Sequence, residues 1–312
     1  MPTAVEQALE KFFGQFFKSD LPDGESQRLG EGALKIDSDL SVLTNPNAGA
    51  FLKLERDPGL RDDFAAIGDA FRTVGHDFHK AAVGADLIDR FILFGTQHQG
   101  GGGGSGAPAV SAALSATGGG GGAGLQADFI AADHKLDATS TDLRAFGKSF
   151  LKIDHSRTPE QFNLKLESLA DGSVTLARDM AADSKAFQQL GNDFVALGGG
   201  DPNALIPAVY KELGGDLQKV AADFGALSTD FLKLDGALVG YQTGGSGTPA
   251  PTATAAGGGG GAGMPVGTAL MNLFQDFHTL GADTGAVAHD SAVLVSDLIQ
   301  PPTTAANTNH SH

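Results

Sequence analysis

The sequence contains no cysteine and no tryptophan, and only 2 of its 312 residues are tyrosine. Without cysteine the chain has no disulfide, no thiolate nucleophile and no cysteine-based zinc site. Tyrosine and tryptophan have a polar group that can form hydrogen bonds, and they are common at solvated recognition surfaces. The side chains of the 20 phenylalanines are wholly apolar. The aromatic residues are therefore expected in a dry, packed core.

Basic residues are also few, since 21 Lys and Arg stand against 37 Asp and Glu, for a net charge of −16 at pH 7. This balance argues against nucleic acid as a partner, because phosphate binding depends on clustered Lys and Arg. No apolar run approaches the roughly 18 residues of a transmembrane helix. The N-terminus, MPTAVEQALEKFFGQFFK, does not resemble a cleavable secretory signal. We expect a protein that is cytoplasmic or exported by a route without such a signal.

Glycine is concentrated in two similar segments. The first, 100–124, reads GGGGGSGAPAVSAALSATGGGGGAG, and the second, 244–263, reads GGSGTPAPTATAAGGGGGAG. Glycine runs lose too much backbone entropy in regular elements, so both are predicted to be flexible linkers, duplicated together with a module. The run GGGGGAG fits a phosphate-binding GxGxxG only superficially, because no strand precedes it and no Lys-Ser or Lys-Thr follows. We therefore predict no nucleotide or other cofactor site.

The linkers divide the chain into modules. The predicted boundaries are a first helical module (1–97), a Gly-rich linker (98–124), a second module of three long helices (125–242), a second linker (243–265), a single long helix (266–299) and a disordered polar tail (300–312).

A seven-residue repeat of mainly apolar residues runs through all three helical parts. Its inward positions alternate spacings of four and three, for example Leu125, Phe129, Ala132, Leu136, Thr139, Leu143, Phe146, Phe150 and Ile153. The same rhythm recurs at 60–78, 162–197, 213–238 and 266–298. A heptad sustained this long is typical of helices that pack along a shared seam. The sequence thus predicts an all-α fold of long amphipathic helices.

Two further heptad positions are biased, one on each side of the inward ones. The position that follows the inward pair is small, and we call it the small-residue column: Gly68, Gly75, Gly147, Ala170, Ala177, Ser184, Gly191, Gly214, Ala221, Ser228, Gly281 and Ala288. The position that precedes the pair is mostly acidic, and we call it the aspartate column: Asp63, Asp77, Asp128, Asp142, Asp179, Asp193, Asp216, Asp223, Asp230, Asp276, Asp283, Asp290 and Asp297. In parallel coiled coils these two positions usually carry opposite charges that pair between helices. Here the small-residue column carries no basic residue that could pair with the aspartates. We expect antiparallel hairpins or bundles, with small residues facing each other and the aspartates turned into water.

The candidates for chemistry are few. The histidines His76, His79, His134, His155, His278 and His289 lack the Glu-x-x-His pattern of a bundle metal site, so we predict a surface role for them and no metal ligands. The aspartate column has a solvated flank as its favoured interpretation and a calcium site or basic partner as the alternative. Asp183 occupies an inward position, as Ser173, Thr139, Thr284 and Ser291 do, and a buried polar residue there can fix helix register.

No group of convergent reactive side chains emerges, so no catalytic residue is predicted. The favoured function is a non-enzymatic structural or interaction protein that associates with itself or another helical protein through Phe/Leu seams. One alternative is an amphipathic coat on a lipid or polymer surface, similar in physical principle to phasin-like proteins. The apolar face of 9–17 suits such a docking role or a core helix, although narrow seams elsewhere count against a coat. A further alternative is an adhesin or effector exported without a cleaved signal.

Overall fold

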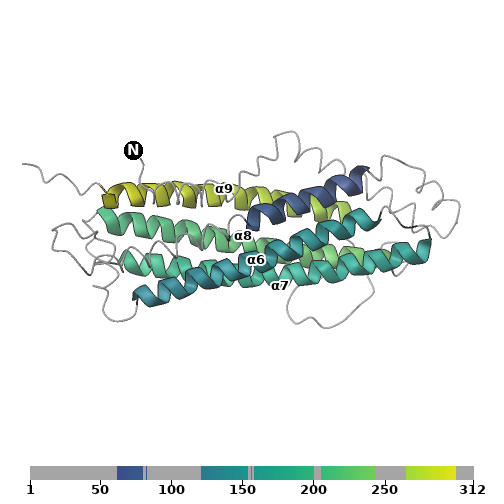
Figure 1. Cartoon of the computed structure of the whole chain (residues 1–312), viewed down its shortest axis with the longest axis horizontal. Helices are drawn as coiled ribbons and strands as arrows, with labels where there is room; N and C mark the ends of the chain where they lie inside the picture. The colour runs from purple at the N-terminus through teal and green to yellow at the C-terminus, as the bar shows by residue number, and fades with distance from the viewer. Residues whose placement is uncertain are drawn as a thin grey trace, which may run out of the picture.

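The computed structural model describes residues 62–79, 82, 121–153, 156, 158–199, 205–242 and 265–299. Their regular structure is entirely helical, which confirms the predicted all-α fold. A helical segment over 62–79 is followed by α6 (Gly121–Ile153), α7 (Pro159–Leu197), α8 (Leu205–Gln242) and α9 (Val266–Ile299). These helices lie side by side along a common long axis (Figure 1). The apolar segment 9–17, His155 and the tail 300–312 lie outside the described residues.

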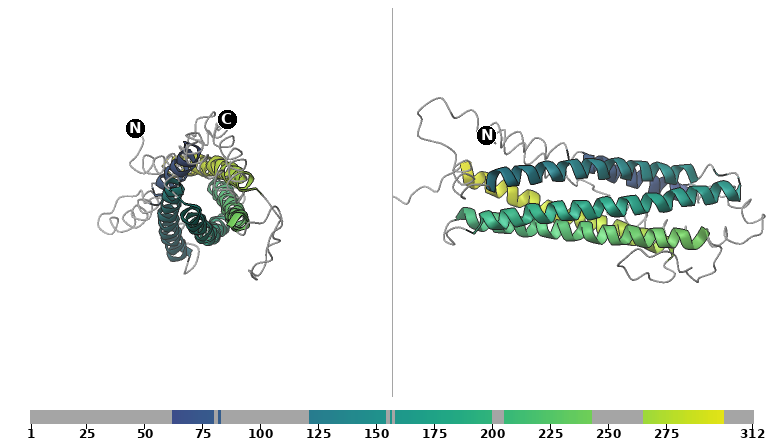
Figure 2. Two further views of the ribbon diagram at one scale, coloured as in Figure 1. Left: turned by 90° about the vertical axis from the view of Figure 1, so that its right-hand side faces the viewer. Right: turned by 90° about the horizontal axis from the view of Figure 1, so that it is seen from below.

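The five helical parts follow one another around a ring in the order 62–79, α6, α7, α8 and α9 (Figure 2, left). Contacts between residues of α7 and α8 give the relative direction of these two helices. On α7 and α8, Gly191 lies against Gly214, while Ser184 donates a hydrogen bond to the backbone oxygen of Ala221. Residue numbers therefore rise along one helix as they fall along its neighbour, which makes α7 and α8 antiparallel.

The start and the end of α7 are set by local chemistry. Thr158 has extended backbone angles and its hydroxyl accepts a hydrogen bond from the Gln161 backbone N–H at 3.3 Å. Pro159 follows as the first helical residue, where its missing N–H costs no intrahelical bond. At the other end the Gly198 N–H donates to the Phe194 oxygen, which closes the last turn. α7 lies between α6 and α8 in the ring.

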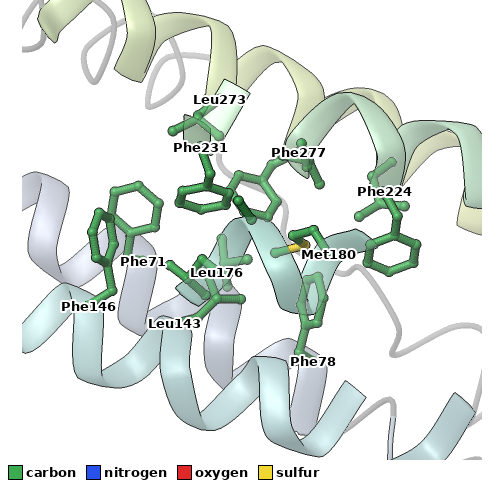
Figure 3. Packing of buried hydrophobic residues seen from close by; sticks show 14 of the residues in the cluster. Phe71, Phe78, Leu143, Phe146, Leu176, Met180, Phe224, Phe231, Leu273 and Phe277 are labelled. Carbon is green, nitrogen blue, oxygen red and sulfur yellow. The ribbon is translucent and has the colours of Figure 1, made fainter. Parts of the chain in front are cut away.

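The core consists mainly of phenylalanine and leucine from all five helical parts. Phe71 is fully buried, and its ring lies 4.9 Å from that of Phe146 on α6 and 5.4 Å from that of Phe274 on α9. Its ring centroid also lies 6.2 Å from that of Phe231 on α8. Figure 3 shows the rings of Phe71, Phe146 and Phe231 converging with the side chains of Leu176 and Met180 from α7. The ring of helices is thus filled by interlocking apolar side chains.

The heptad positions predicted to face inward are buried throughout α6. They comprise Leu125, Phe129, Ala132, Leu136, Thr139, Leu143, Phe146, Phe150 and Ile153. The helix itself begins at Gly121, four residues before the predicted start of the second module. Among the described helices, none is sufficiently long and apolar to cross a membrane.

Candidate functional site

Two kinds of contact alternate around the ring, and the heptad columns decide which kind forms. The small-residue columns meet between 62–79 and α6 and between α7 and α8. If Gly68 carried a Cβ atom, that atom would lie 2.7 Å from the Gly147 backbone oxygen. A Cβ atom at Gly191 would lie 2.8 Å from the Gly214 backbone oxygen. These helix pairs approach so closely that their backbones touch at the glycines.

Serines complete the contact between α7 and α8. Ser184 donates to the Ala221 oxygen at 2.6 Å, and Ser228 donates to the Ala177 oxygen at 2.6 Å. Both serines belong to the small-residue column and both reach the backbone of the opposite helix. A hydroxyl can do this only where the helices are already close, so the glycines and the serines depend on each other.

The aspartate columns meet between α8 and α9. Asp216, Asp223 and Asp230 of α8 lie opposite Asp290, Asp283 and Asp276 of α9, each pair within hydrogen-bonding reach. Asp216 and Asp230 are buried, and Asp223, Asp276, Asp283 and Asp290 are half-buried. The prediction that the aspartate column is turned into water is therefore wrong for this seam, because each column is covered by the aspartates of the neighbouring helix. We call these three pairs the α8–α9 aspartate seam.

A second aspartate seam joins α6 to α7. Asp128 faces Asp193 and Asp142 faces Asp179, again within hydrogen-bonding reach. These four aspartates are half-buried. The repeat of the arrangement on a second pair of helices shows that it follows from the heptad pattern.

Burial and the facing acid both favour the protonated form of one member of each pair. Burial, reinforced by the hydrogen bond and charge of Asp142, raises the pKa of Asp179 to about 7. Burial, together with the charges of Asp283 and Asp276, raises the pKa of Asp223 to about 7.

The same causes act more weakly at the outer pairs. Burial and the facing Asp128 raise the pKa of Asp193 to about 6, and burial and the facing Asp216 raise that of Asp290 to about 6. The pKa of Asp276 is also raised, first by burial and then by Asp230.

Three buried carboxyl oxygens identify where a proton is needed. The Oδ2 atoms of Asp179, Asp223 and Asp290 are buried, and the described part of the chain offers them no hydrogen-bond partner. Each belongs to the pair member whose pKa is raised. A proton on one carboxyl of the pair supplies a donor to the other carboxylate and removes one of two like charges.

Two lysines neutralise part of the negative charge of the α8–α9 aspartate seam. Lys219 Nζ lies 2.6 Å from Asp216 Oδ1, and Lys233 Nζ lies 2.5 Å from Asp230 Oδ1. Both are three residues after the aspartate that they contact, on the same helix. The corresponding residue for Asp223 is Ala226, so the middle pair has no such lysine.

A buried polar pair lies in the core between α6 and α7. The Thr139 hydroxyl donates to Asp183 Oδ2 at 2.6 Å, and neither side chain is accessible to solvent. Burial raises the pKa of Asp183 to about 8, against the opposing effect of the Thr139 hydrogen bond. Ser173 and Thr284 instead bond backbone oxygens of their own helices, and the side chain of Ser291 is outside the described residues. Thr139 and Asp183 thus form a contact that depends on the register between α6 and α7.

The histidines do not gather into a site. His76, His134, His278 and His289 are exposed, and His79 Nδ1 lies 2.9 Å from Asp137 Oδ1. Within the described ranges, no group of three or more His, Asp or Glu side chains could hold a metal ion. A facing aspartate pair offers at most four oxygens, fewer than the six to eight that calcium takes.

Sequence reasoning did not predict that the aspartate columns of neighbouring helices bury each other. The signal was present, because aspartates recur every seven residues on helices that are neighbours in the ring. No protein-family model, curated protein or solved structure matches the chain.

Proposed function

We propose that this chain is a non-enzymatic structural or interaction protein, a helical bundle whose role is to associate and to space its parts. The observation that supports this proposal is the use of inward side chains for packing. The Phe71 ring, for example, contacts phenylalanine rings of α6, α8 and α9. The other inward residues of the described helices are mainly leucine and phenylalanine. The partner class that fits such seams is a helical protein or a second copy of the chain.

The proposal is tested by the mass of the full chain in light scattering over a range of concentrations, together with a screen of hydrolase, phosphatase and redox substrates. We expect no turnover. We also expect the mass measured in solution to change when a core residue is replaced. Phe71→Ala should change both the mass and the helicity, whereas His134→Ala at an exposed position should change neither. Turnover that is abolished by a single substitution with unchanged mass and helicity would contradict the proposal.

The alternative of an amphipathic coat requires the bundle to open, because phenylalanines such as Phe224 and Phe277 are buried inside it. The exposed apolar side chains that the described helices offer are scattered, with Leu164 at 65% and Leu232 at 51% exposure on different helices. Flotation with lipid vesicles or polyester granules separates the two proposals. Recovery of the chain in the floating fraction would favour the coat.

A further inference from the structure

The α8–α9 aspartate seam combines three facing acid pairs with a glycine-rich connection. The pairs occupy three successive heptads, and α9 is joined to α8 through segment 243–265, which we predict to be a flexible linker. We propose that this seam is a pH-sensitive clasp, in which one shared proton per aspartate pair holds α9 against α8. Loss of these protons then lets α9 separate from α8. The proposal does not depend on which partner the bundle binds.

The need for a proton follows from the geometry of each pair. Two ionised carboxylates are acceptors only, so neither can donate to the other. The Oδ2 atoms of Asp223 and Asp290 are buried, with no donor from the described residues within reach. When both members of a pair are ionised, a buried acceptor is left unpaired and two like charges face each other across the seam. A single proton relieves both costs.

Among the described residues, the charged side chains that act on the seam include four from α8 and α9 themselves. They are Glu212, Lys219 and Lys233 from α8 and His289 from α9. Phenylalanine rings of 62–79 and α7 pack against rings next to the seam: Phe71 and Phe78 contact Phe277, and Phe187 contacts Phe224. Segment 62–79 also carries a buried carboxyl, Asp77. On α7, Asp171 acts on Asp235 of α8. The lysines lie at the two outer pairs, so the middle pair, Asp223 and Asp283, depends most on its proton.

The direction of the pH effect follows from the sign of the shifts. The pKa of Asp290 is raised to about 6 and that of Asp223 to about 7, from 3.8, by burial and by the facing acid. A carboxyl whose pKa is raised in the closed state favours closure fully below its ordinary pKa, and this preference is lost as the pH rises through the raised value. The clasp should therefore weaken mainly between pH values of about 4 and 7.

Label separation in urea tests the clasp directly. Because the natural chain has no cysteine, Thr229→Cys on α8 and Thr279→Cys on α9 provide the two labelling sites, both at exposed positions. Energy transfer or spin-label distances then report separation of α9 from α8, while circular dichroism reports total helicity. From about pH 5 to about pH 8.5 we expect the urea midpoint for label separation to fall by about 1 M or more.

A matched pair of variants assigns the effect to the seam. The clasp variant carries Asp223→Asn, Asp276→Asn and Asp290→Asn. The control carries Asp62→Asn, Asp69→Asn and Glu167→Gln, which changes the same number of charges at exposed positions. The fall in midpoint should shrink to less than half in the clasp variant and persist in the control. An equal fall in all three proteins, or no fall in the natural chain, would overturn the proposal.

Proton uptake gives a second measurement. The natural chain, refolded from urea in weakly buffered solution near the raised pKa values of the seam, should take up more protons than the clasp variant. The comparison with this variant is needed because both proteins keep Asp179, Asp183 and Asp193, whose pKa values are also raised. Equal uptake by the two proteins would also overturn the proposal.

Discussion

Alanine substitution at the adjacent glycines Gly214 and Gly215 should have opposite effects on stability, although both lie in the same turn of α8. A Cβ added at Gly214 would lie 2.7 Å from the Gly191 oxygen, 2.7 Å from Val195 Cγ2 and 2.8 Å from the Val195 nitrogen. Two of these three atoms belong to the backbone of α7, so they cannot rotate away and the helices must move apart. At Gly215 no atom lies within 4 Å of the added Cβ.

The magnitudes follow from two opposing effects. Replacing an interior helical glycine by alanine stabilises a helix by about 1 kcal/mol, because alanine loses less backbone entropy on folding. Overpacking a close contact costs about 1–3 kcal/mol. Gly215→Ala should therefore raise the free energy of unfolding by about 1 kcal/mol. Gly214→Ala should lower it by up to about 2 kcal/mol, as the sum of the same gain and the overpacking cost.

The assay is urea unfolding followed by far-UV circular dichroism, with linear extrapolation of the free energy of unfolding to water. The comparison isolates the α7–α8 contact, because both variants remove one glycine from the same helix and add one methyl group. Equal stabilisation by the two substitutions would refute the close approach of Gly191 and Gly214 on which the reasoning depends.

Four further predictions concern the core, the α7–α8 contact and the aspartates. Asp183→Asn should flatten the loss of stability between pH 3.8 and about 8, the range over which burial of the natural carboxyl disfavours its ionisation, and unfolding midpoints across this range check it. Ala226→Lys should place a cation three residues after Asp223. It should raise the free energy of unfolding by the ~0.2–1 kcal/mol of a surface ion pair at about pH 8 but not at about pH 5, and thermal midpoints at the two pH values check this. Ser228→Ala should lower the free energy of unfolding by about 1 kcal/mol through loss of its hydrogen bond to α7, whereas Thr229→Ala, which loses a bond within its own helix, should cost less. Phe71→Ala should cost about 3–5 kcal/mol, measured by the same unfolding, since its fully buried ring contacts three other helices.

The aspartate predictions can fail independently of the packing predictions. If Ala226→Lys stabilised the chain equally at both pH values, Asp223 would not be the group that titrates. If Asp183→Asn left the pH profile unchanged, the buried carboxyl would contribute nothing to it.

The sequence alone was sufficient to predict long helices and their inward faces. A heptad depends only on the local geometry of the α-helix, so residues such as Leu136 and Leu143 could be assigned to the core without knowledge of any partner. The small-residue column also indicated close approach, since Gly68 and Gly147 have no other reason to recur at this position. Asp183 could be recognised as an inward polar residue for the same reason.

Only the tertiary structure decided which columns face each other. The order of helices around the ring sets α8 beside α9, so Asp223 is half-buried and faces Asp283. The ring order likewise brings Thr139 to Asp183 across α6 and α7. Local periodicity fixes the face of a helix on which a side chain lies, whereas the charge state of that side chain depends on what the neighbouring helix places opposite it.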